Sequence, residues 1–217
     1  MDRRIALKNM GLALGYTVAT PTIISLMQSC KQETGLDWTP VFFSPEEGAV
    51  IMQLADLILP KTDTPSATEV GVHSFLDRYW MEVSEPEEQD LIKSGLGNFI
   101  EKAMADSGKQ AGDTLTAEDL EPVLAAALKR REKEDEAKLF DTLTTYNEAV
   151  SEGQPAELDG DVSRFVFANQ FRDAVIWSYK TSEYVGEEVL AYLPVPGEYI
   201  GCADVDELTG GRAWSLS

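Results

Sequence analysis

The side chains that could ligate a metal are scarce in this chain of 217 residues. His73 is the only histidine, and Cys30 and Cys202 are the only cysteines. Zinc, haem and iron–sulfur sites each need several sulfur or imidazole ligands at defined spacings, and no C-x-x-C pair or Cys/His cluster supplies them. The sequence therefore predicts no metal-binding residues.

Groups capable of acid–base or nucleophilic chemistry are present but isolated. Asp56 and Asp63 could work as a carboxylate pair, yet a chain with 38 acidic residues produces such pairs by chance. Thr181-Ser182-Glu183 offers hydroxyls without a histidine as base, so a helix N-cap is the better interpretation. His73 lies on an apolar stripe beside Phe75 and Leu76 and is typical of a packed or surface histidine rather than of a proton shuttle. With no P-loop and no G-x-G-x-x-G after a strand, we expect no catalytic and no cofactor-binding residue.

The charge balance limits the possible partners. The formal net charge is −20, and 43% of the residues are hydrophobic. A strongly negative protein repels phosphate backbones, so nucleic acid is excluded as a partner, and charge-driven binding to an anionic membrane surface is disfavoured. The length suits one domain with a core of its own.

The first 30 residues have the pattern of an export leader. Arg3 and Arg4 form a basic start that resembles a twin-arginine signal, and residues 9–29 carry no charge. Cys30 follows Leu26-Met27-Gln28-Ser29, which resembles a lipobox and predicts acylation of the cysteine. We therefore expect a protein exported to the cell envelope or periplasm and lipid-anchored to a membrane. An uncleaved transmembrane anchor is the alternative, which Pro21 disfavours.

The elements that position these residues are helical. Residues 31–43 form a tether whose Trp38, Phe42 and Phe43 are expected to dock on the body, and residues 44–217 form the domain. Ser44 and Glu47 have the spacing of a capping box. Apolar residues at helical spacing predict an all-α domain of six to seven helices with an irregular C-terminal tail. The expected helices are 45–59, 72–79, 86–104, 116–128, 139–153, 165–179 and 183–192.

The tail contains the residues that we expect to contact a partner: Tyr192, Pro196, Gly197, Tyr199 and Cys202. Proline and glycine keep this segment out of a helix, and a rigid non-helical strip suits a protein interface. Once Cys30 is acylated, Cys202 has no intramolecular partner. An intersubunit disulfide, a buried thiol and a reactive free thiol all remain open.

Two blocks of sequence are more distinctive than the patterns described above. The first runs from Leu54 to Asp77 and contains LADLILPKTDTPSA, and the second runs from Tyr179 to Cys202 and contains YLPVPGEYIGC. With the leader, they resemble the gluconate 2-dehydrogenase subunit 3 family over roughly residues 44–205. The resemblance implies a non-catalytic small subunit of a membrane-associated dehydrogenase that oxidises sugars or sugar acids.

In such complexes FAD binds to a separate large subunit, and a cytochrome or another acceptor takes the electrons. The small subunit escorts its partner through twin-arginine export and supports its maturation and membrane attachment. The alternative is a stand-alone exported lipoprotein that binds a small ligand through the aromatic residues of 165–179, or that binds another envelope protein.

Overall fold

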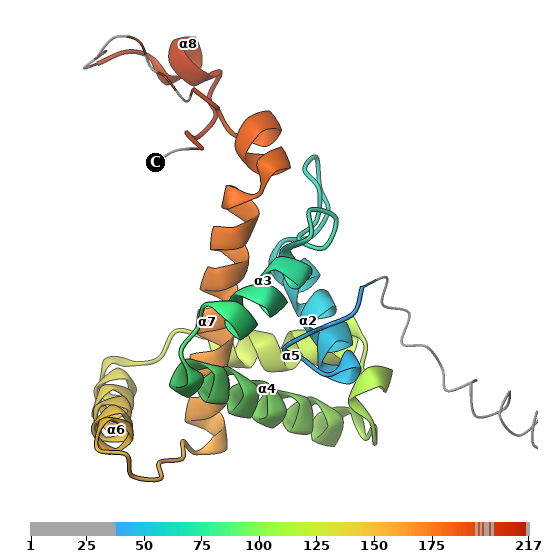
Figure 1. The fold of residues 1–217 in the computed structure, drawn as a ribbon, viewed down its shortest axis with the longest axis vertical. Coiled ribbons are helices and arrows are strands. Elements are labelled where there is room, and N and C mark those ends of the chain that lie inside the picture. The colour runs from blue at the N-terminus through green and yellow to red at the C-terminus, as the bar shows by residue number, and fades with distance from the viewer. Residues whose placement is uncertain (1–37, 194, 196, 198–199, 201, 216–217) are drawn as a thin grey trace, which may run out of the picture. The chain divides into compact units, whose positions relative to one another are not determined.

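The computed structural model describes residues 38–193, 195, 197, 200 and 202–215, all of which belong to one compact unit. Six α-helices of seven or more residues account for most of the described chain, which contains no strand (Figure 1). The all-α prediction is confirmed. The helices are α2 (Pro45–Ile58), α3 (Val72–Glu82), α4 (Pro86–Ser107), α5 (Ala117–Leu128), α6 (Lys133–Ser151), α7 (Gly160–Thr181) and the short α8 (Val205–Thr209).

Capping residues explain where the helices begin. The Ser44 hydroxyl accepts from the Glu47 amide, and the Glu47 carboxylate accepts from the Ser44 amide, so the expected capping box is confirmed. Thr116 and Asp119 form the same reciprocal arrangement at the start of α5. Each box satisfies two backbone groups that a helix end would otherwise leave without a partner.

Helix α7 is the centre of the domain, and α2, α3, α4 and α5 pack against it. Its buried face contains Phe167, Phe171 and Val175. Helix α4 approaches it most closely at Gly95, where a Cβ would lie 2.6 Å from the Cβ of Phe167. Glycine at this position therefore lets the two backbones come into contact.

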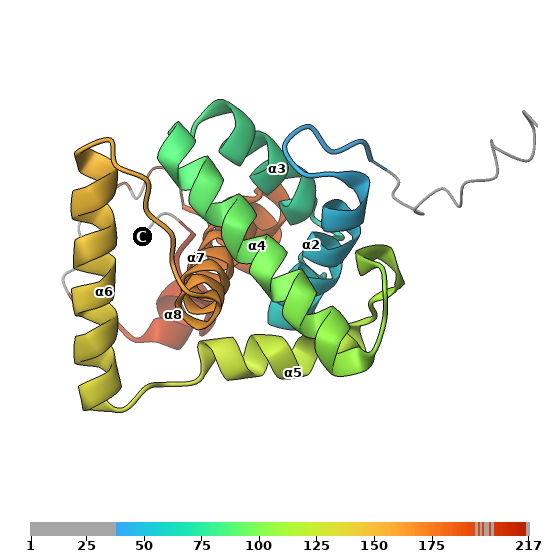
Figure 2. The same ribbon diagram turned by 90° about the horizontal axis from the view of Figure 1, so that it is seen from below.

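Helix α6 is attached more loosely, and Figure 2 shows it at the edge of the helical body. Leu139 is its only buried residue and packs with Val162 and Val166 in a small second cluster. The charged run 129–136 leads into α6 and lies mostly in solvent. This helix contributes little to the main core.

The predicted helix 183–192 is confirmed in part, because residues 183–189 are helical and the chain becomes extended at Leu190. The Ser182 hydroxyl donates to the Tyr179 carbonyl at the end of α7, so it does not cap a new helix. A short π-helix, η2 (Val185–Val189), follows and ends at Leu190, whose backbone is extended. This extension lets Ala191 pair with Ala213 and Ser215.

The tail was also predicted to be irregular, and this is true only in part, because it contains α8 and the bridge between Ala191 and Trp214. Asp204 accepts from the Asp206 amide and caps α8. A five-residue helix gives too short a periodic signal to be seen in the sequence.

Candidate functional site

Residues 38–43 lie against the helical body, and we call them the strap. A single carboxylate, that of Asp77 on α3, accepts the backbone amides of Val41, Phe42 and Phe43 at 2.7, 3.0 and 2.9 Å. Asp77 is only 1% exposed. Three amide donors compensate much of the cost of burying a charge. Asp77 therefore fixes the position at which the chain enters the domain.

Aromatic packing completes the attachment of the strap. Phe43 is buried and meets Trp80 edge to face, with ring centroids 5.5 Å apart. The Lys93 ammonium lies 4.8 Å from the centroid of the Phe42 ring and also pairs with Glu47. The expected docking of the tether aromatics is confirmed.

His73 belongs to the same packing. Its ring is buried on α3 and meets the edge of Trp38 at a centroid distance of 5.1 Å. The Trp38 indole N–H donates to the sulfur of Met52 at 3.3 Å. These surroundings are those of a packed histidine.

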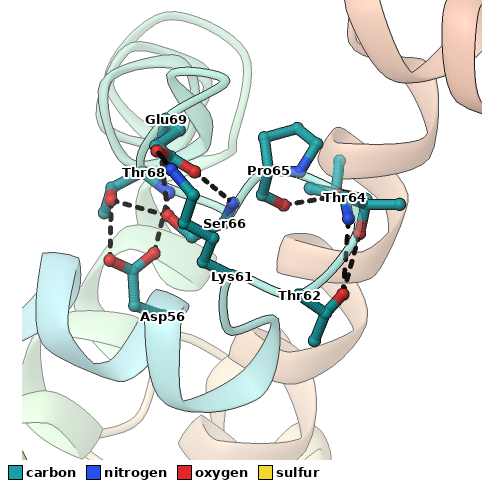
Figure 3. A network of polar contacts seen from close by, with 9 residues as sticks. Asp56, Lys61, Thr62, Thr64, Pro65, Ser66, Thr68 and Glu69 are labelled. Carbon is teal, nitrogen blue, oxygen red and sulfur yellow. Dashed lines mark hydrogen bonds and ion pairs between the residues drawn. The ribbon is translucent and has the colours of Figure 1, made fainter.

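The loop after α2 is held by a polar network (Figure 3). The Asp56 carboxylate accepts from the amide of Thr68 at 2.9 Å and from its hydroxyl at 2.7 Å. Glu69 accepts from the amide of Ser66 and pairs with Lys61. The hydrogen bond from Lys61, and then that from Ser66, holds the pKa of Glu69 below its usual value. Asp56 thus stabilises the loop.

This loop brings the two distinctive sequence blocks together. The Tyr179 hydroxyl of α7 donates to the Pro65 carbonyl at 2.7 Å, across 114 residues of sequence. Beside this contact lies an open cleft of about 690 Å³ between the loop 61–70 and residues 182–188. The carboxylates that line it are Asp63, Glu69, Glu183, Glu187 and Glu188. The cleft is acidic, and Lys61 is its only basic lining residue.

The composition of the cleft restricts its chemistry. The Ser182 hydroxyl is engaged with the Tyr179 carbonyl, and the single histidine of the chain is packed elsewhere. No group of three or more histidine, cysteine or acidic residues that could hold a metal ion occurs among the described residues. The described lining of the cleft is therefore rich in carboxylates and contains neither a histidine nor a cysteine.

The expected partner-contacting residues lie in the C-terminal segment, residues 190–215. In Figure 1 this segment lies beyond the end of α7. Tyr192 is 46% exposed, and Gly197 has a φ of +74°, in the left-handed region that favours glycine. Pro196 and Tyr199 lie outside the described residues, as do Arg3, Arg4 and Cys30 at the other end of the chain.

Cys202 is exposed and forms no disulfide within the part of the chain that the structure describes. Of the three alternatives for this thiol, the exposure of Cys202 is inconsistent with a thiol buried within the chain. The segment around it leaves several large apolar side chains in solvent: Leu193, Val195, Ile200, Val205, Leu208 and Trp214. A segment of this composition is suited to a protein interface.

The aromatic residues of 165–179 divide between the core and the surface, where Trp177 is 45% exposed. Phe167 and Phe171 are buried in the main core, where their rings stack at 5.5 Å. None of the three principal surface clefts of the described chain is lined by residues 165–179. In the same described part, no helix has the length and apolar character needed to cross a membrane.

Asp77 is the functional residue that sequence reasoning missed. It lies one helical turn from His73 and one from Trp80, so it is a charge within the buried stripe of α3. A charge at such a position is rarely buried without a partner, and this is the signal that could have found it.

Comparison with known families gives one match. The family model described as Gluconate 2-dehydrogenase subunit 3 matches residues 45–197, which include α2 to α7, the loop 61–70 and η2. No curated protein and no solved structure matches the chain.

Proposed function

The chain belongs to the gluconate 2-dehydrogenase subunit 3 family, and from this membership we propose that it is the non-catalytic small subunit of a flavin-dependent sugar or sugar-acid dehydrogenase. It escorts the large, FAD-binding subunit through twin-arginine export and supports its maturation and membrane attachment. A cytochrome or another electron-acceptor subunit completes the complex. The match over residues 45–197 is the observation that carries this proposal.

The strap supports the role as an escort. Asp77 and Trp80 hold the strap and lie more than 30 residues further along the chain. The leader region therefore joins a defined position on the body only after α3 has folded. Twin-arginine export carries folded proteins, so a leader attached in this way suits a chain that folds and binds its partner first.

The strap also bears on membrane attachment. Residues 31–37 separate Cys30 from Trp38, the first residue of the strap. Seven residues span at most about 25 Å even when fully extended. If Cys30 is acylated, the domain stays within that distance of the membrane surface and holds its partner there.

Export is tested with a double substitution of the leader. Arg3→Lys with Arg4→Lys should strand both this chain and the flavoprotein in the cytoplasm, and the flavin content of envelope fractions is the readout. Lys8→Arg, which keeps the twin arginines, is the matched control. Unchanged export of the double variant would refute the twin-arginine pathway.

Anchoring is tested separately at Cys30. Cys30→Ser should move the mature chain from membrane to soluble fractions and abolish lipid labelling. Cys202→Ser should retain both. Mass spectrometry that shows an unmodified Cys30 in the exported chain would exclude the lipid anchor.

The exposed thiol of Cys202 suits an intersubunit disulfide that forms after export, when the interface has already been made. Non-reducing electrophoresis of the native complex should show a band near the summed masses that disappears with reductant and in Cys202→Ser. Two separate bands without reductant would leave a free thiol beside a non-covalent interface.

A further inference from the structure

A second exposed surface lies on α3 and α7, away from the C-terminal segment. Phe75 and Trp177 are 46% and 45% exposed, and their ring centroids are 5.5 Å apart. Tyr79 joins them at 6.1 Å from Phe75 and 5.4 Å from Trp177. The result is a cluster of three rings, two of which are nearly half exposed. Such a patch in a soluble protein usually marks an interaction site.

Basic side chains border this cluster. Arg78 lies three residues after Phe75 on α3, and Lys180 lies three residues after Trp177 on α7, so each is on the same helix face as its ring. Both are exposed. Within the described part of the chain neither forms an ion pair, although acidic residues outnumber basic ones by 38 to 18.

Acidic residues lie near both cations, including Glu183 three residues after Lys180, but none of them forms an ion pair with Arg78 or Lys180 in the described chain. Asp173 lies one turn before Trp177, but its carboxylate is engaged with Arg172 at 2.8 Å. Glu82 follows Arg78 by one turn at the end of α3, and the two form no ion pair. Arg78 and Lys180 are thus available to a carboxylate on another molecule.

We propose that this aromatic–cationic face, formed by Phe75, Tyr79, Trp177, Arg78 and Lys180, binds the flavoprotein subunit through an apolar patch flanked by carboxylates. Aromatic side chains and arginine are enriched at the centres of protein interfaces, where they contribute most of the binding energy. The partner is expected to present carboxylates because Arg78 and Lys180 form no ion pair within the described chain. This inference rests on the proposed function, because it names where the partner binds.

Two other occupants fit the same face less well. An anionic lipid surface is negative over its whole extent and would be repelled by a chain with a net charge of −20, whereas a protein partner need only place a few carboxylates opposite Arg78 and Lys180. In a symmetric dimer the face would meet its own copy, so that Arg78 and Lys180 would face the same cations across the axis. A protein surface with carboxylates around an apolar centre meets neither obstacle.

The first test measures how much flavoprotein the full chain retains. The tagged chain is expressed in its native cells and purified, and bound flavin per chain is measured by absorbance. Phe75→Ser with Trp177→Ser should lower retention at least about tenfold, as loss of interface anchors does. Arg78→Glu with Lys180→Glu should lower it in the same direction. Phe140→Ser is the matched control, since Phe140 is 71% exposed on α6.

Circular dichroism and unfolding midpoints establish that the variants remain folded, which is expected because the substituted side chains lie at the surface. If the wild-type chain retains no flavoprotein, the proposed function fails. If the wild type retains it and both double variants retain the same amount, the proposed function stands and this inference is wrong.

The second test identifies the occupant directly. A photo-crosslinking phenylalanine analogue replaces Trp177 in the full chain, and the same analogue replaces Phe140 in the control. Irradiation in cells followed by mass spectrometry should join position 177, and not position 140, to a flavoprotein peptide that contains Asp or Glu. Crosslinks from position 177 only to lipid, or only to a second copy of this chain, would overturn the inference.

Discussion

The strap and the C-terminal segment have similar sequences and opposite fates. Both combine proline with large apolar side chains, although the C-terminal segment also contains the short helix α8. In the strap, Phe43 is 4% exposed, whereas Tyr192 in the C-terminal segment is 46% exposed. Composition therefore does not decide which of two such segments is buried.

The two segments differ in which groups accept the hydrogen bonds of their backbone amides. A non-helical segment can be buried only where its amide groups find partners, and Asp77 supplies one carboxylate for three of them. The C-terminal segment finds backbone partners within itself, through Ala191 with Ala213 and Ser215. These bonds pair its backbone at Ala191, while Leu193 and Trp214 beside them stay partly in solvent.

The largest effect is expected from matched truncations of the two segments. Phe43→Ala should lower the free energy of unfolding by about 3–4 kcal/mol, because it empties a site packed against Trp80. Tyr192→Ala should change it by less than about 0.5 kcal/mol, as is usual for an exposed side chain. Urea denaturation of both variants provides the measurement. Similar losses in the two would show that the C-terminal segment is as deeply integrated as the strap.

A smaller loss is expected when the carboxylate that holds the strap is removed. Asp77→Ala leaves three amides without their acceptor and should cost about 2–3 kcal/mol. Hydrogen exchange should show faster exchange at Val41, Phe42 and Phe43 than at the amides within α7.

Asp63→Ala is the matched control for Asp77→Ala, since Asp63 is an exposed aspartate on the loop 61–70. Its free energy of unfolding and the exchange of the strap amides should remain those of the wild type. If strap exchange is unchanged in Asp77→Ala as well, Asp77 does not hold the strap.

The smallest effect is expected in the loop 61–70, at the carboxylate of Glu69. The pKa of Glu69 is lowered from 4.5, so its contacts contribute stability above about pH 4.5 that is lost as pH falls through the lower folded pKa. Lys61→Met should move the pKa of Glu69 back toward 4.5 and narrow that window.

Carboxyl NMR titration measures this shift, and Asp119 serves as the internal control. Its pKa is lowered to about 2 by Lys109 and then by the amide of Thr116, neither of which contacts the loop. A pKa of Glu69 that does not change in Lys61→Met would show that the Ser66 amide is sufficient.

Much of the helical body could be predicted because its signals are local. The capping residues Ser44 and Thr116 and the breaker Pro60 act within a few residues of themselves, so helices α2 and α5 begin where the sequence indicates. The helix predicted at 183–192 begins where the sequence indicates but is partly a π-helix and ends at Val189, and Ser182 does not cap it with its side chain. The Ser182 hydroxyl donates to the Tyr179 carbonyl, and this hydrogen bond depends on how α7 ends.

The amino-acid sequence was sufficient for the helical class, for most helix starts and for the membership of a family that acts with a partner. Only the tertiary structure showed the role of Asp77, the hydrogen bond from Tyr179 to Pro65 and the exposure of the Phe75–Trp177 cluster. Each depends on residues that are distant in sequence and adjacent in space. Local patterns report what a segment prefers, whereas burial and recognition depend on which surface that segment meets when the chain has folded.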